Sequence, residues 1–177
     1  MIGPSFSDEL RDAGLLGLPF SWCADGTFFG RENLTTEQND GLDAVILAHD
    51  PEALTSATVN AERNRRIVAG ASFDVTGYGA VPLTGREEDK VALMGLMLKA
   101  QMLKAAGVTV PILTVRDGVN ANHMLTPDQM IELVQAGMLW IEATMAVSWA
   151  MKDGVAPFEG GIPSDFADDV YWPQDAS

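Results

Sequence analysis

The hydrophobic pattern of the 177-residue chain is strongest between Thr126 and Lys152, near its carboxyl end. Apolar side chains recur there at the spacing of one helix face, which predicts an amphipathic helix of about 27 residues and about 40 Å. Thr126 and Pro127 suit its first positions, and Gly154 suits its end. Its predicted buried stripe consists of Met130, Ile131, Val134, Met138, Ile141, Met145 and Trp149. Only the preceding segments or other chains can bury a stripe of this length.

Alternating apolar and polar positions, with turn residues between them, predict three β-hairpins before this helix. The paired segments are residues 20–23 with 27–30, residues 71–83 folded around Gly77, and residues 112–116 with 121–125. Further helices are predicted from Thr35 or Thr36 to His49, over 60–70 and over 86–106. We therefore expect an α+β fold, with short antiparallel β-hairpins and interspersed helices packed on the long C-terminal α-helix.

The predicted helix over 86–106 carries apolar side chains around most of its circumference. Such a helix is either largely buried or lies at an interface. Because the helix over 126–152 also outspans a small domain, we expect a homo-oligomer, with a trimer as the specific prediction. Its interface should bury at least roughly 1,000 Å².

The chain is expected to have three regions. Residues 1–58 form an N-terminal attachment region of one hairpin and a short helix, residues 59–154 form the main α+β domain, and residues 155–177 form an irregular aromatic and acidic C-terminal arm. Both ends lack the periodicity that builds a core, so we interpret them as docking arms for other chains. The aromatic anchors predicted for this interface are Trp22, Phe28, Phe29, Phe166, Tyr171 and Trp172. In the alternative interpretation both ends wrap the domain and complete its core.

The amino-acid composition limits which kinds of partner and binding site the chain is expected to have. The net charge of −14, with 25 acidic and 11 basic residues, argues against nucleic-acid binding. Cys23 is the single cysteine, so neither an internal disulfide nor a cysteine-cluster metal site is expected.

The first ten residues have neither a basic nor an apolar signal region, which indicates synthesis in the cytosol. Asp128, Glu132 and Glu142 interrupt the long apolar helix, so no membrane insertion is expected.

The sequence contains only weak candidates for catalytic residues. His49 and Asp50 could form a pair, but their position before a proline favours ordinary helix-end roles. Asp117 and His123 are too few for a metal site, and an Asx-stabilised turn explains them better. A loose acidic cation site at Asp165, Asp168 and Asp169 lacks any EF-hand spacing. Cys23 has no basic neighbour that would activate it. We therefore predict no enzyme, no cofactor and no metal, and we assign no catalytic residue.

Three sequence features in a fixed order resemble a known family. They are residues 62–73, the acidic start of the helix over 86–106, and residues 114–130 continuing to 148–152. In this order they resemble the domain of unknown function DUF4376, which occurs in proteins of tailed bacteriophages and prophages, often near tail-fibre or tail-tip genes. Residues 17–22 and the turn at Asp25 also resemble segments that precede this domain in such proteins.

The resemblance implies a structural protein of a tailed-phage virion, at the tail tip, fibre or another peripheral appendage, that docks to other virion proteins. It would be made in the bacterial cytoplasm and then become part of the virion. The family supplies no catalytic residues that could be transferred. Two alternatives stay open: an enzyme that degrades host-surface polymer, which needs paired carboxylates about 5–10 Å apart, and a fibre assembly chaperone that is absent from the finished particle.

Overall fold

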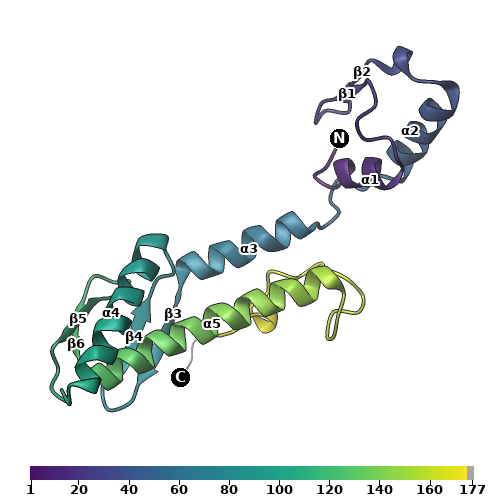
Figure 1. Ribbon diagram of the computed structural model, residues 1–177. Coiled ribbons are helices and arrows are strands. Elements are labelled where there is room, and N and C mark those ends of the chain that lie inside the picture. The colour runs from purple at the N-terminus through teal and green to yellow at the C-terminus, as the bar shows by residue number, and fades with distance from the viewer. Residues whose placement is uncertain (175–177) are drawn as a thin grey trace. The chain divides into compact units, whose positions relative to one another are not determined.

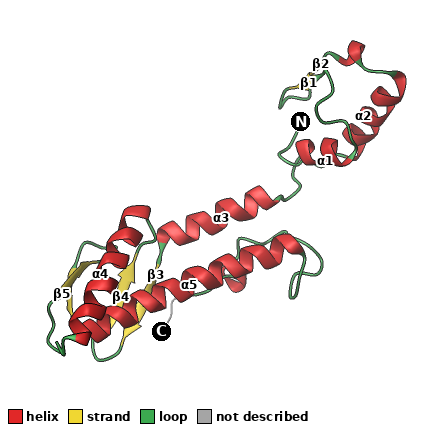
Figure 2. Ribbon diagram, in the orientation of Figure 1, coloured by secondary structure: helices red, strands yellow, loops and turns green. Residues whose placement is uncertain are grey.

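The computed structural model describes residues 1–174 and divides the chain into two compact units (Figures 1 and 2). The first unit is Met1–Ser56, and the second contains the residues from Ala57 on. This division lies two residues before the predicted boundary between residues 58 and 59. The described elements confirm an α+β fold with two-stranded antiparallel sheets and a long C-terminal helix.

The first unit is a small helix–hairpin–helix cluster. Its elements are α1 (Phe6–Asp12), β1 (Ser21–Trp22), β2 (Phe28–Phe29), a 3₁₀ turn (Arg31–Asn33) and α2 (Thr36–Ala48). Its core consists of Phe6, Leu10, Leu15, Leu34 and Leu42. The β1–β2 hairpin was predicted, and α2 begins where expected: Thr35 and Gln38 cap each other's backbone N–H groups. Helix α1 was not predicted, because seven residues are too few to show a clear helical period.

The second unit begins with a helix. Two hairpins follow, with a second helix between them, and a long helix comes after the second hairpin. Its elements are α3 (Ser56–Ala69), β3 (Ala71–Val75), β4 (Gly79–Leu83), α4 (Glu87–Ala105), β5 (Leu113–Arg116), β6 (Asn122–Leu125), α5 (Pro127–Asp153) and a 3₁₀ turn (Asp169–Tyr171). The β3–β4 and β5–β6 hairpins confirm the predicted pairs.

The two hairpins place one apolar face each against α4 and α5 (Figure 1). In β3–β4, Phe73 lies opposite Val81, and in β5–β6, Leu113 lies opposite Leu125. All four side chains are at most 2 % exposed, so alternate positions along each strand define the core. From α5, the first-half residues Met130, Leu133 and Val134 complete it.

Helix α5 has the predicted ends but a different buried face. Thr126 and Gln129 form a reciprocal cap at its start, and Gly154 ends it in the left-handed conformation with φ 60°. The predicted stripe is wrong at Met138 and Trp149, which are 58 % and 49 % exposed. The buried side chains of α5 are instead Pro127, Met130, Leu133, Val134, Thr144, Ser148 and Met151.

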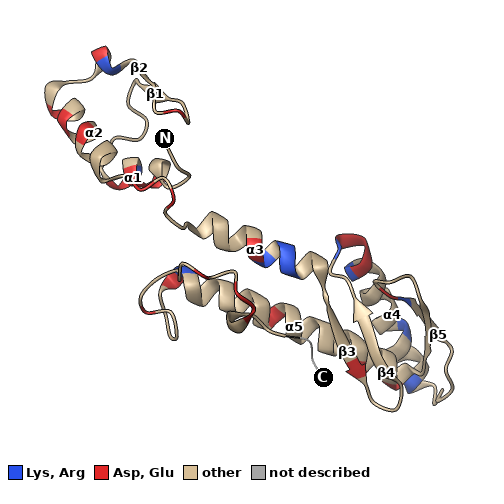
Figure 3. Cartoon of the chain, turned by 180° about the vertical axis from the view of Figure 1, so that it is seen from behind, with Lys and Arg blue, Asp and Glu red and all other residues tan. Residues whose placement is uncertain are grey.

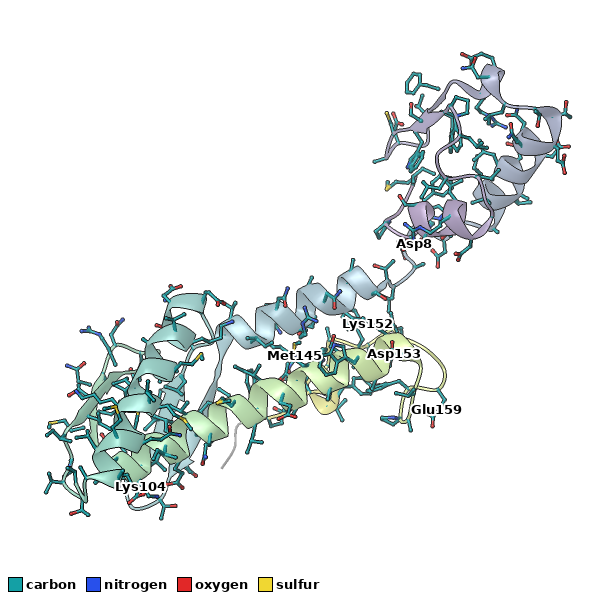
Figure 4. All side chains as sticks on the ribbon, in the orientation of Figure 1. Asp8, Lys104, Met145, Lys152, Asp153 and Glu159 are labelled. Carbon is teal, nitrogen blue, oxygen red and sulfur yellow. The ribbon has the colours of Figure 1, made fainter. Side chains whose placement is uncertain are left out.

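The face changes because α5 changes neighbours along its length. Its first half packs on β3, β6 and α4, whereas its second half meets α3 and the residues after Gly154. The Lys152 ammonium donates to the Asn60 side-chain carbonyl of α3 at 2.9 Å, near the end of α5 (Figure 4). One straight stripe cannot serve two sets of neighbours that lie on different sides of the helix.

The residues after α5 are part of the second unit, which corrects their interpretation as an arm outside the fold. Phe158, Phe166 and Trp172 are 5 %, 9 % and 3 % exposed. The Trp172 indole donates to the Phe166 carbonyl at 2.7 Å, and the Trp140 indole of α5 donates to the Pro173 carbonyl at 3.3 Å. We call residues 155–174 the C-terminal wrap. For this end of the chain the structure fits the alternative interpretation, in which the C-terminal residues complete the core.

Helix α5 is long and apolar enough to cross a membrane by length and composition alone. Core helices of soluble proteins pass the same test, and 28 % of the most apolar 18 residues of α5 are buried within this chain. The absence of membrane insertion therefore stays a prediction.

Candidate functional site: an apolar groove beside an exposed ridge

An apolar groove of about 380 Å³ opens between α4 and α5. Its floor is the core side of β3 and β4, where Phe73 and Leu83 lie. Its α4 wall includes Met94, Met97 and Leu98, and its α5 wall includes Met138, Trp140 and Ile141. The polar side chains among its lining residues are Thr84, Lys90 and Gln101. The groove can therefore accept apolar side chains, but it presents few groups for chemistry.

The outer face of α4 forms an exposed apolar ridge next to this groove. Val91, Met94, Leu98 and Met102 are 64 %, 68 %, 61 % and 67 % exposed. They recur every three or four residues, so they follow one line along the helix. On the opposite side of α4, Leu93, Leu96, Met97 and Leu103 pack against the core. The helix is thus apolar on two faces, and residues 1–174 cover one of them.

A second, smaller hollow lies on the other side of the ridge. It has a volume of about 270 Å³ and is lined from α4 by Asp89, Ala92, Leu93 and Leu96 and from the second hairpin by residues 114–118. The ridge therefore stands between two depressions, of which the α4–α5 groove is the more apolar. A convex apolar ridge beside a concave apolar groove is a surface that can fit a protein partner.

Charges are unevenly distributed along α4. Glu87, Glu88 and Asp89 occupy the first turn, where the helix dipole favours acids, whereas Lys99 and Lys104 lie farther along (Figure 3). Lys104 pairs with Asp128 at the start of α5 at 2.6 Å, and its position there can be followed in Figure 4. Lys90 pairs with Glu87 at 2.7 Å.

The predicted N-terminal anchors lie together in the first unit, but only Phe29 points mainly outward. Trp22 and Phe28 are opposite each other in β1–β2, and both contact the buried Phe6 ring edge-on at 5.5 Å and 5.9 Å. They are half-buried in this unit, whereas Phe29 is 56 % exposed. Most of the aromatic surface at this end therefore completes the small core of the first unit.

The predicted C-terminal anchors are placed differently from expectation. Phe166 and Trp172 are buried in the C-terminal wrap, so they are corrected from docking anchors to core residues of the second unit. Tyr171 is half-buried and its ring lies edge-on to Phe158 at 5.7 Å. Its hydroxyl donates to Asp165 at 3.0 Å, and this bond raises the pKa of Tyr171.

His49 bonds a different acid from the one adjacent in sequence. Its side chain is 3 % exposed, and its Nδ1 lies 2.8 Å from a Glu9 carboxylate oxygen. The Gly3 N–H donates to its Nε2 at 2.8 Å, so Nδ1 carries the proton and donates to Glu9. Asp50 instead accepts from the Glu52 N–H at 2.9 Å. His49 is therefore a satisfied core histidine that fixes the start of the chain.

Asp117, His123 and Tyr78 form a hydrogen-bonded chain between the two hairpins. Asp117 lies 2.7 Å from His123 Nε2, and the Tyr78 hydroxyl lies 3.0 Å from His123 Nδ1. Asp117 also accepts from the backbone N–H groups of Val119 and Ala121, which is the predicted Asx turn. The His123 bond is the main cause that lowers the pKa of Asp117, and the two N–H bonds add to it. Sequence reasoning missed Tyr78, because it comes from the other hairpin.

Two of the remaining acidic candidates, Asp165 and Asp169, are engaged within the chain. Asp169 pairs with Arg66 at 2.8 Å, and Asp165 accepts from Tyr171. Within residues 1–174, no group of three or more His, Cys, Asp or Glu side chains could hold a metal ion. Cys23 is exposed next to the β1–β2 turn.

Residues 50–171 match the family described as "Domain of unknown function (DUF4376)". The match covers more than half of the chain. The protein belongs to the DUF4376 family. The matched DUF4376 segment runs past Gly154 through the wrap to Tyr171, so it extends beyond the predicted domain limits of 59–154 at both ends. Neither the curated proteins nor the solved structures contain a match to the chain.

Sequence reasoning did not identify the groove of the DUF4376 domain, although one signal for it was present. The helix over 86–106 was expected to be buried or at an interface because apolar residues surround it. The structure places its inner apolar face on the core and leaves its outer face exposed. Which hairpin and which part of α5 would form the opposite wall depends on long-range packing that periodicity does not encode.

Proposed function

We propose that this protein is a structural, non-catalytic component of a tailed-phage virion, in which the DUF4376 domain docks to another virion chain through α4. The exposed ridge of Val91, Met94, Leu98 and Met102 is the observation that carries the proposal. Four large apolar side chains in one line are costly to leave in water, and such patches on soluble proteins mark interaction sites.

The chemistry of the groove supports a docking role over a catalytic one. Its wall is mainly Met, Leu, Ile, Phe and Trp, and Lys90 is its charged lining residue. The Asp117–His123–Tyr78 chain ties two hairpins together and uses both carboxylate oxygens of Asp117 internally. The net charge of −14 also favours a protein partner over a nucleic acid.

The virion setting rests on the resemblance of residues 62–73, 114–130 and 148–152 to phage proteins that carry this domain. Family membership by itself assigns no function. The setting is therefore tested directly, by the composition of purified particles.

Mass spectrometry of density-purified particles tests the proposal. We expect peptides of this chain at the stoichiometry of a minor structural protein. A Leu98→Glu variant should be lost from particles, whereas Leu139→Glu should be retained. Leu139 is a matched control, because it is 65 % exposed against 61 % for Leu98 but does not line the groove.

Two results would overturn the proposal. Particles that lack this chain although assembly requires it would identify an assembly chaperone. Release of sugars from host-envelope polymer by the purified protein would identify an enzyme.

A further inference from the structure

We infer that the partner which covers the α4 ridge is a second copy of this chain, bound antiparallel about a twofold axis near the middle of α4. The inference rests on the proposed docking function and names the partner of the same surface. It replaces the predicted trimer with a dimer. Three features of the surface carry it: its shape, its charge and one glycine.

The shape of the surface is self-complementary. A twofold interface uses the same patch on both subunits, so the patch must contain both a projection and the hollow that receives it. The α4 ridge and the α4–α5 groove meet this requirement, because Met94 and Leu98 belong to both. The ridges of the two copies can therefore pack along each other, with Met94 and Leu98 of each copy at the rim of its own groove, and the contacts repeat about the twofold axis.

The spacing along the ridge gives the register. Val91, Gly95, Leu98, Met102 and Ala105 alternate at intervals of four and three residues, which is the spacing of a coiled-coil seam. A twofold axis between residues 96 and 97 places Val91 opposite Met102 of the partner and Gly95 opposite Leu98 of the partner. Each small or β-branched position then faces a long flexible one.

The charges of the α4 segment favour a second copy as the partner and an antiparallel pairing of the two helices. The chain as a whole repels itself at −14, but the segment 86–104 carries four bases against three acids. The bases are Arg86, Lys90, Lys99 and Lys104, and the acids are Glu87, Glu88 and Asp89. Residues 86–90 carry two bases and three acids, a net charge of −1, whereas residues 91–104 carry two bases and no acid. Antiparallel pairing brings these opposite net charges together, and parallel pairing would bring like net charges together. The helix dipoles are also antiparallel in this arrangement.

Gly95 is the third feature. It lies in the middle of α4, where glycine lowers helix stability relative to alanine. Among residues 1–174, no heavy atom lies within 4 Å of a Cβ added at this position, so the described fold does not require glycine there. A small residue at the centre of this seam would let a second helix approach closely.

The mass of the purified full-length chain in solution tests the dimer. Analytical ultracentrifugation should give a dimer at about 100 μM, and Leu98→Glu should weaken association by at least about 100-fold, since it would bury an unpaired carboxylate. Leu139→Glu should leave association unchanged. Because Leu98 is exposed within one chain, the circular dichroism and melting temperature of the Leu98→Glu monomer should stay close to those of a diluted wild-type chain. A wild-type monomer at this concentration, or association unaffected by Leu98→Glu, would overturn the inference.

Cysteine cross-linking tests the direction without depending on a charged substitution. In a Cys23→Ser background, Val91→Cys and Met102→Cys proteins are prepared separately and then mixed under mild oxidation. The antiparallel register predicts a covalent dimer in the mixture and little in either protein alone. Efficient cross-linking of Val91→Cys to itself would indicate parallel pairing and contradict the inference.

The dimer and the virion role can fail separately. A monomer in solution that is nevertheless found in particles would overturn the second copy as partner and leave the proposed function standing. A chain that is a dimer in solution but absent from particles would overturn the proposed function and leave the second copy as the partner of the ridge.

Discussion

At the scale of single residues, Arg66 joins α3 to the C-terminal wrap. Its guanidinium donates to the Ala167 carbonyl at 2.6 Å, pairs with Asp169 at 2.8 Å and lies over the Trp172 ring at 5.1 Å. On its own helix it also bonds Glu62 at 2.7 Å. The Arg66 side chain is 11 % exposed, whereas Asp169 is 77 % exposed, so the guanidinium is sheltered although its ion pair with the wrap reaches the surface.

Arg66→Met should lower the free energy of unfolding by about 1–3 kcal/mol, because the stem is kept while the bonds to the wrap are lost. Arg65→Met is the matched control. Arg65 pairs with the same Glu62 but is 62 % exposed, so little change is expected. Urea titration followed by tryptophan fluorescence measures both. Equal effects of the two substitutions would show that Arg66 does not hold the wrap.

Asp117 makes a pH-dependent contribution to stability. Its pKa in the folded chain lies below the ordinary value of 3.8, mainly because of the His123 bond. A carboxylate with a lowered folded pKa stabilises the fold above its unfolded pKa and loses that contribution as the pH falls through the folded pKa.

Asp117→Asn should therefore lower the melting temperature at pH 5, and the difference from wild type should shrink as the pH falls below about 3.8. Asp74→Asn, at an exposed acid in β3, serves as the control and should show a small difference at every pH. Thermal melts at several pH values measure the effect. A difference that grows towards acid would contradict the direction of the pKa shift.

At the scale of elements, the sequence predicts ends and turns better than faces. Thr126, Pro127 and Gly154 bound α5 as expected, because caps depend on a few neighbouring residues. The buried face of α5 could not be predicted as one stripe, since its two halves have different neighbours. The α4–α5 groove was missed for the same reason: it exists only once β3–β4 and α5 are placed beside α4.

Leu133→Ala and Met138→Ala test the corrected face of α5. Leu133 is fully buried in the core, so its truncation should cost about 2–5 kcal/mol. Met138 is 58 % exposed, and its truncation in the monomer should cost less than about 1 kcal/mol. Denaturant unfolding at low protein concentration measures both. A larger loss of unfolding free energy for Met138→Ala than for Leu133→Ala would show that Met138 is buried, as the sequence pattern predicted.

At the scale of the whole molecule, the C-terminal wrap belongs to the second unit, and the family match includes most of it. This could not be predicted from periodicity, because the wrap has no regular helix or strand apart from a 3₁₀ turn. Its aromatic residues are instead held by local turns, such as the one in which the Trp172 indole bonds the Phe166 carbonyl. Aromatic residues without periodicity therefore fit both a docking arm and a core wrap.

Removal of the wrap should destabilise the second unit. A fragment of residues 57–177 should fold cooperatively, whereas a fragment of 57–153 should be molten or unfolded. The shorter fragment lacks Phe158, Phe166 and Trp172, and truncation of even one buried aromatic side chain costs about 3–5 kcal/mol against a total of about 5–15 kcal/mol. Calorimetry compares the two fragments. A cooperative melt of 57–153 at an unchanged temperature would return residues 155–177 to the role of a separate arm.

Oxidative footprinting of methionines in purified particles tests most directly whether another chain covers the α4 ridge in the working assembly. Met94 and Met102 are 68 % and 67 % exposed in the single chain, and Met124 of β6 is 55 % exposed. We predict that brief hydroxyl-radical treatment oxidises Met94 and Met102 in the free Leu98→Glu monomer but spares them in particles, while Met124 reacts in the monomer at a rate similar to theirs. Oxidation of Met94 and Met102 in particles at the rate seen in the monomer would contradict the account.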